Sequence, residues 1–133
     1  MIVDASIAVS WLVKTPFSEP ASRLRSAQCA APELMLVEAT NALLKYARIG
    51  LISLDSILAG VEALKVAVSQ FVPDHQLLPS ATRIGASNGH KIYDCLYLAL
   101  ALERRETLIT ADRRLAALAG TLNIPTELIE PIS

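Results

Sequence analysis

Four carboxylates occupy positions in the sequence from which they could act together: Asp4, Glu38, Asp94 and Asp112. If all four converge, their repulsion must be offset, because a like-charge pair about 4 Å apart costs about 4 kcal/mol at an effective dielectric constant of about 20. Divalent cations provide that compensation. An oxygen-only cluster without Cys or His favours Mg²⁺ or Mn²⁺ over Zn²⁺. One or two such ions could activate a water molecule and hold a phosphodiester.

Two of these acids come from the stretch between His90 and Leu115. Its pattern predicts a helix from about Lys91 to Arg105, with Asp94 in the first turn. A short buried strand at 107–109 follows, and Asp112 lies just past its end, where a last helix begins. In a parallel α/β sheet, ligands gather beyond the carboxyl ends of the strands. We therefore expect both carboxylates to approach one edge of the sheet.

Asp4 closes a short apolar segment, Met1–Ala5, that is predicted to be the first buried strand. Ser6 follows and is expected to cap the next helix. Taken alone, Asp4 equally fits an ordinary acid at a helix N-terminus, where the dipole stabilises it by about 0.3–1 kcal/mol. Its joint placement with the other three acids is what favours a chemical role.

Glu38 lies inside a helix predicted to run from about residue 33 or 34 to a C-terminal cap at Gly50. Asn41 and Lys45 follow it at i+3 and i+7 and therefore share its face. A solvated stripe is the ordinary interpretation of such residues. The mostly apolar neighbours of Glu38 distinguish it from an arbitrary surface acid.

The other elements show no chemical signal. The helix at 53–68 is amphipathic and is the first candidate for a dimer or partner surface. In the helix at 91–105, Tyr93 and Tyr97 stand at core spacing. His75 is assigned to a solvated loop. The remaining predicted elements are helices at Ser18–Gln28 and Leu78–Ser87, and strands at Phe71–Pro73 and Ile124–Ile129.

Composition sets outer limits on the function. The chain of 133 residues is expected to form one domain, and its 53% apolar content suggests surface for a partner. A net charge of −1, from 12 basic and 13 acidic residues, gives no global indication of nucleic-acid binding. No membrane span or secretory signal is apparent, and the two isolated cysteines, Cys29 and Cys95, suit a reducing cytoplasm.

Four sequence blocks together resemble the PIN (PilT N-terminal) domain, and specifically the small VapC-type toxin ribonucleases. They are Ile2-Val3-Asp4-Ala5-Ser6, Glu38-x-x-Asn41, Tyr93-Asp94-Cys95-Leu96-x-Leu98-Ala99-x-Ala101, and Leu108-Ile109-Thr110-x-Asp112-x-x-Leu115. Each block is weak alone, but their shared order and spacing are fairly specific. The resemblance implies an α/β fold: a PIN-like three-layer α/β/α sandwich, with a central parallel sheet of four to five short strands, over residues 1–133.

The same resemblance implies a function and its residues. Asp4, Glu38, Asp94 and Asp112 would hold Mg²⁺ or Mn²⁺, and the polar supports would be Ser6, Asn41 and Thr110. The expected reaction is endonucleolytic hydrolysis of RNA by metal-activated water, and the expected partners are a second copy and a cognate antitoxin. Some relatives carry a further acid after the fourth. Here Arg113-Arg114-Leu115 follows, which leaves open whether a second metal binds.

Five basic residues near the acids in sequence are candidates for phosphate contacts: Lys45, Arg48, Lys91, Arg113 and Arg114. Each also fits an ordinary surface charge. Two other functions stay open at this point. One is a phosphatase or phosphoacceptor domain that uses Asp4, although Asp-x-Asp is absent because Ser6 holds the third position. The other is a non-catalytic interaction module.

Overall fold

The computed structural model, which describes residues 1–132, contains a five-stranded parallel sheet. The strand order is β3-β2-β1-β4-β5, so the first strand is central. This confirms the predicted α/β sandwich and sets the number of strands at five. The strands are β1 (Ile2–Val3), β2 (Ala30–Pro32), β3 (Gln70–Val72), β4 (Leu108–Thr110) and β5 (Thr126–Leu128).

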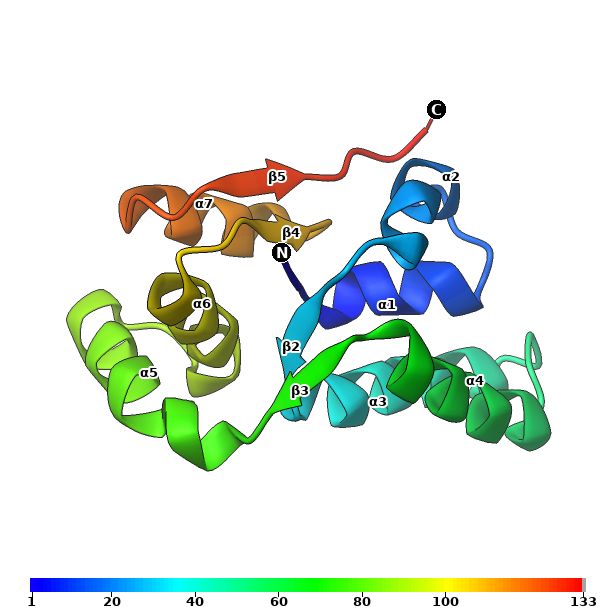
Figure 1. The fold of residues 1–133 in the computed structure, drawn as a ribbon. Coiled ribbons are helices and arrows are strands. Elements are labelled where there is room, and N and C mark those ends of the chain that lie inside the picture. The colour runs from blue at the N-terminus through cyan, green and yellow to red at the C-terminus, as the bar shows by residue number, and fades with distance from the viewer. Residues whose placement is uncertain (133) are drawn as a thin grey trace.

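Helices cover both faces of the sheet, and Figure 1 shows them as two groups. Helices α1 to α4 lie on one side, whereas α5, α6 and α7 lie on the other. Right-handed crossovers require this arrangement, because the chain moves from β1 to β3 in one direction and from β4 to β5 in the other. The helices are α1 (Ala5–Leu12), α2 (Ser18–Ala21), α3 (Leu34–Arg48), α4 (Leu54–Ala67), α5 (Asp74–Asn88), α6 (Ile92–Arg104) and α7 (Arg113–Thr121), with a 3₁₀ helix η1 (Ser22–Ser26).

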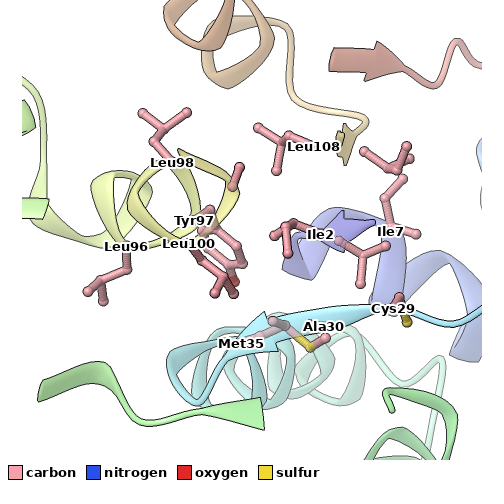
Figure 2. Close-up of a cluster of buried hydrophobic side chains, with 14 of the residues drawn as sticks. Ile2, Ile7, Cys29, Ala30, Met35, Leu96, Tyr97, Leu98, Leu100 and Leu108 are labelled. Carbon is pink, nitrogen blue, oxygen red and sulfur yellow. The ribbon is translucent and has the colours of Figure 1, made fainter. Parts of the chain in front are cut away.

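Helix α6 is the centre of the hydrophobic core. Every residue from Cys95 to Ala101 is buried, because α6 packs on the sheet with one side and on α5 with another. Figure 2 shows its Tyr97, Leu98 and Leu100 in one cluster with side chains of the strands and of α3. A helix that is apolar on nearly all sides must be enclosed in this way. Asp94, in its first turn, is thereby fixed relative to the sheet.

The strand order reverses between β1 and β4, which are paired in register through Val3 and Ile109. From β1 the chain moves to β2, and only after β3 does it return to the other side of β1 as β4. Such a switch point opens a crevice beyond the carboxyl ends of the two strands. Asp4 follows β1 and Asp112 follows shortly after β4, so the fold brings both acids to this crevice.

Helix α5 begins earlier than the sequence pattern indicates. It starts at Asp74, not Leu78, so His75 belongs to the helix and Pro79 lies inside it. Proline lacks the N–H that an interior helical position needs, and for that reason a start close to Pro79 was expected. Packing overrides this cost, since Leu77 and Ala81 are fully buried.

Two further predictions were wrong. The segment 18–28 does not form one helix but divides into α2 and η1. Tyr93, assigned to the core by its spacing, is 54% exposed, whereas Tyr97 one turn later is buried. Tyr93 lies in the first turn of α6, before the stretch Cys95–Ala101 in which every residue is buried.

The hairpin of α3 and α4 leaves large apolar side chains exposed, namely Ile49, Leu51, Leu54 and Leu58. Ser53 caps α4, and its hydroxyl accepts a hydrogen bond from the Ser56 N–H. None of the helices among residues 1–132 has the length and hydropathy needed to span a membrane. The exposed side chains of this hairpin are part of the 53% apolar content of the chain.

Candidate functional site

Asp4 is the most enclosed acid of the crevice, with only 6% of its surface exposed. It is the N-cap of α1, and its Oδ1 accepts hydrogen bonds from the Ile7 N–H (3.4 Å) and the Ser6 hydroxyl (2.6 Å). Thr110 Oγ1 donates to its Oδ2 at 2.7 Å. Burial raises the pKa of Asp4 to about 6, the charge of Asp112 adds to this rise, and the three donors oppose it. Asp4 is thus an acid whose negative charge the fold only partly compensates.

Ser6 does not cap the helix as expected, because Asp4 takes that position. Instead, Ser6 Oγ accepts a hydrogen bond from the Ala111 N–H at 3.0 Å while donating to Asp4. Thr110 Oγ1 similarly accepts from the Asp112 N–H at 2.9 Å while donating to Asp4. Two hydroxyls therefore fasten the turn after β4 to the acid after β1, which fixes Asp4 and Asp112 relative to each other.

Asp112 is the N-cap of α7. Its Oδ1 accepts hydrogen bonds from the N–H groups of Arg114 (2.9 Å) and Leu115 (3.3 Å). This cap offsets the unfavourable position of two arginines at a helix N-terminus. Arg113 forms an ion pair with Glu130 at 2.8 Å and so has a structural partner of its own.

Glu38 and Tyr97 link α3 to α6 across the crevice. The Tyr97 hydroxyl donates to Glu38 Oε1 at 2.6 Å. Burial raises the pKa of Glu38, the Tyr97 hydrogen bond lowers it, and the charges of Asp94 and Asp74 raise it further. Burial also raises the pKa of Tyr97 well above its ordinary value, with the charges of Glu38 and Asp4 adding to the effect. Tyr97 thus stays a neutral donor between two acids.

Asp94 lies in the first turn of α6, as the sequence predicts. Its Oδ2 is 2.9 Å from His90 Nε2, and the two side chains are 29% and 20% exposed. Among the described residues, His90 is the only side chain that bonds to this carboxylate. Asp94 is therefore a partly exposed acid of α6, and its charge acts on Glu38.

The structure does not bring every predicted residue to the crevice. Asn41 is exposed and, within residues 1–132, forms no hydrogen bond with any of the four acids. Lys45 lines a mainly apolar cavity of about 480 Å³ that is also bordered by Ser6, the hydrogen-bond partner of Asp4. Arg48, Lys91 and Arg114 are exposed and form no ion pair in the part of the chain that the structure describes.

The chemistry of the donors fits Mg²⁺ or Mn²⁺. The four acids offer only oxygen, and none of them pairs with a lysine or arginine among residues 1–132. The charges of Asp112 and Asp94 instead raise the pKa values of Asp4 and Glu38. Within the same residues, no three His, Cys, Asp or Glu side chains lie close enough to hold one ion together. As placed, the side chains of these residues offer at most two ligands to one ion, and Mg²⁺ in proteins usually keeps several water ligands beside one or two carboxylates.

Sequence reasoning missed three residues of this site: Tyr97, His90 and Asp74. Tyr97 looked like core, and it is buried, but its hydroxyl serves Glu38. Spacing could have found both Tyr97 and His90, which stand at i+3 and i−4 from Asp94 and therefore reach the same side of α6. No local signal indicates Asp74, whose charge acts on Glu38 from the start of α5.

Comparison with known proteins gives one family and one fold. The sequence matches the model of the PIN domain family over residues 1–121. The crystal structure of PAE2754 from Pyrobaculum aerophilum superposes with a TM-score of 0.71 at 24% sequence identity, covering 91% of this chain and 90% of that one. Comparison with curated proteins gives no match. The family match spans β1 to α7 and all four acids, so the chain belongs to the PIN domain family, a family of nucleases.

Proposed function

We propose that this protein is a metal-dependent endoribonuclease that acts as the toxin of a toxin–antitoxin pair. Membership of the PIN family supports a nuclease role. The observation that carries the proposal is the buried Asp4 at the switch point of the sheet. Its pKa is raised to about 6 and the charge of Asp112 adds to that rise, with no basic side chain paired to it among residues 1–132. A fold retains such a charge at a cost, and binding a cation is the chemistry that offsets it.

In this proposal Asp4, Glu38, Asp94 and Asp112 hold the cation. When bound, Mg²⁺ or Mn²⁺ supplies Lewis-acid charge that activates water and stabilises the leaving oxygen of a phosphodiester. Ser6 and Thr110 keep Asp4 oriented through their hydroxyls. Tyr97 does the same for Glu38. Asn41 is the least supported of the proposed polar contributors, since its side chain is exposed.

Four basic residues that are close to the acids in sequence and exposed are the proposed contacts to the RNA backbone: Lys45, Arg48, Lys91 and Arg114. Lys45 is the best placed, because it lines the cavity that Ser6 borders. Arg113 is the weakest candidate, since Glu130 already pairs with it. Each side chain that binds a phosphate should make the slope of log affinity against log salt concentration steeper by about one.

The proposal includes a second copy of this chain and a cognate antitoxin as partners. The exposed apolar side chains of the α3–α4 hairpin support a protein partner, because monomers rarely leave such a patch in water. The two buried free thiols, Cys29 and Cys95, support activity in the cytoplasm.

Two other functions, an Asp4-dependent phosphoacceptor and a non-catalytic interaction module, compete with this one. PIN membership favours a nuclease over an Asp4-dependent phosphoacceptor. A non-catalytic interaction module is supported by the exposed apolar hairpin alone. It predicts no binding of Mg²⁺ or Mn²⁺, so metal binding distinguishes it from the nuclease.

The decisive experiment is cleavage of a mixed structured RNA in the presence of EDTA, Mg²⁺ or Mn²⁺. We expect cleavage with either metal and none with EDTA. Asp94→Asn should reduce the rate by at least about 100-fold, since even partners of metal ligands contribute roughly 10–100-fold. Asp55→Asn is the matched control, because Asp55 is an exposed acid in the first turn of α4. Cleavage by Asp94→Asn at the unmodified rate would refute the proposal.

A further inference from the structure

We propose that His90 is a positioning residue of this nuclease site, which holds Asp94 in the orientation that receives the cation. The inference rests on the proposed function and deepens it. His90 Nε2 lies 2.9 Å from Asp94 Oδ2, and no hydrogen bond within residues 1–132 occupies Oδ1. The imidazole therefore engages one oxygen of the carboxylate and leaves the other free.

Asp94 depends on this contact more than the other acids depend on theirs. Asp4 is held by two hydroxyls and a backbone N–H, and Asp112 by two backbone N–H groups. Asp94 has His90 alone in the described part of the chain. Its side chain is 29% exposed, so without His90 it is free to rotate toward solvent. The entropy of fixing it would then be a cost of binding the metal.

Backbone contacts at the end of α5 fix the position of His90. The His90 N–H donates to the Gly85 carbonyl at 3.3 Å, and Gly89 before it adopts the left-handed conformation with φ of 62°. Gly85 allows a close approach, because a Cβ there would lie 3.2 Å from the His90 carbonyl oxygen. The end of α5 thus fixes His90 against the first turn of α6.

Partners of metal ligands orient those ligands, and losing one typically costs about 10–100-fold in metal affinity or activity. The chain has a second histidine, His75, which is exposed on α5 and forms no side-chain hydrogen bond among the described residues. It is therefore a matched control for the loss of an imidazole.

The test is isothermal titration calorimetry with Mn²⁺, at one pH, on four proteins: wild type, His90→Ala, His90→Gln and His75→Ala. We expect His90→Ala to bind Mn²⁺ about 10–100-fold more weakly. His90→Gln keeps an N–H donor and should bind almost as tightly as wild type, and His75→Ala should be unchanged. The melting temperatures in EDTA should agree, which separates positioning from loss of structure. In RNA cleavage at a fixed metal concentration, His90→Ala should lower kcat and leave KM unchanged.

Two results would overturn the inference while the proposed function stands: wild-type affinity in His90→Ala, or a His90→Gln variant as weak as His90→Ala. Absence of Mn²⁺ binding by the wild type would instead refute the proposed function, and the inference with it. A readout without metal is the NMR spectrum of the His90 ring, which should shift with Asp94→Asn and not with Asp112→Asn. An unresponsive ring would show that the contact is absent, and would also overturn the inference.

Discussion

Asp4 combines two roles that ordinarily occur apart, because it caps a helix and is also a buried carboxylate at the switch point of the sheet. Capping alone needs only a partly exposed oxygen, and would keep the pKa of an acid low. Here burial dominates and raises the pKa of Asp4 from 3.8 to about 6. The folded protein therefore binds a proton at Asp4 more tightly than the unfolded chain does.

This sets a pH dependence of stability for the metal-free protein. Between about pH 4 and pH 6 the folded state holds a proton that the unfolded chain releases, so the contribution of Asp4 to stability falls as the pH rises through that window. Above it the ionised carboxylate costs about 3 kcal/mol, at about 1.4 kcal/mol for each pKa unit. We expect Asp4→Asn to stabilise the protein in EDTA at pH 8 and to have little effect near pH 4.

Urea denaturation at several pH values, on wild type and Asp4→Asn in EDTA, measures this difference directly. The comparison removes the contributions of titrating groups that do not interact with Asp4, because both proteins share them. A constant difference in unfolding free energy across the pH range would contradict the prediction.

Glu38 is a second acid whose pKa the fold raises, and Tyr97 donates the hydrogen bond that opposes this rise. Burial and two neighbouring acids raise the pKa of Glu38, and the Tyr97 hydroxyl donates to it at 2.6 Å. Because the pKa of Tyr97 is itself raised, this hydroxyl stays protonated and remains a donor at neutral pH. The site therefore includes a buried neutral donor in addition to its acids.

Among the secondary-structure elements, α5 and α6 together position Asp94, which does not follow a strand. Helix α6 carries Asp94, and the turn after α5 carries His90. Gly85 permits this turn to pack closely, since a Cβ would meet the His90 carbonyl oxygen at 3.2 Å and Cys95 Sγ at 3.6 Å. The nearest of these atoms belongs to backbone, which cannot move aside as a flexible side chain can.

Gly85→Ala should therefore destabilise the protein by about 1 kcal/mol, because overpacking costs about 1–3 kcal/mol and better helix propensity returns only about 1. The matched control is Gly120→Ala in α7, where a Cβ would meet nothing within 4 Å. That substitution should stabilise by about 0.5–1 kcal/mol. Thermal unfolding of both variants tests the pair, and equal effects of the same sign would contradict the close approach at Gly85.

At the scale of the whole molecule, the order of the strands creates the crevice and the helix layers leave one apolar hairpin exposed. The exposed side chains Ile49, Leu51, Leu54 and Leu58 belong to the α3–α4 hairpin. A stable protein interface buries about 800 Å² on each partner. A hairpin with several exposed apolar side chains is the kind of surface that contributes to such an area.

If a second copy covers this hairpin, Leu58→Glu should shift the protein from dimer to monomer in sedimentation velocity. The reason is that a carboxylate at an apolar interface loses its hydration without gaining a partner. Leu102→Glu is the control, because Leu102 is exposed on α6 in the opposite helix layer. A wild-type protein that sediments as a monomer at all concentrations would contradict a homodimer through this hairpin.

The sequence by itself determined the local features of this protein. Hydrophobic patterns located β1, β3, β4 and β5 and the helices α3, α4, α6 and α7, and the four acids fell at element ends or inside a helix where the structure has them. These features depend on residues a few positions apart, which is the range over which backbone propensity and side-chain periodicity act.

Only the tertiary structure decided which groups surround each acid. Tyr97 and Glu38 are separated by 59 positions, and Thr110 and Asp4 by 106, so no local pattern indicates either hydrogen bond. The same applies to the early start of α5 and to the exposure of Tyr93, since each depends on what packs against the helix. Burial and the pKa values that follow from it belong to the assembled fold, because desolvation is produced by residues that are distant in the chain and close in space.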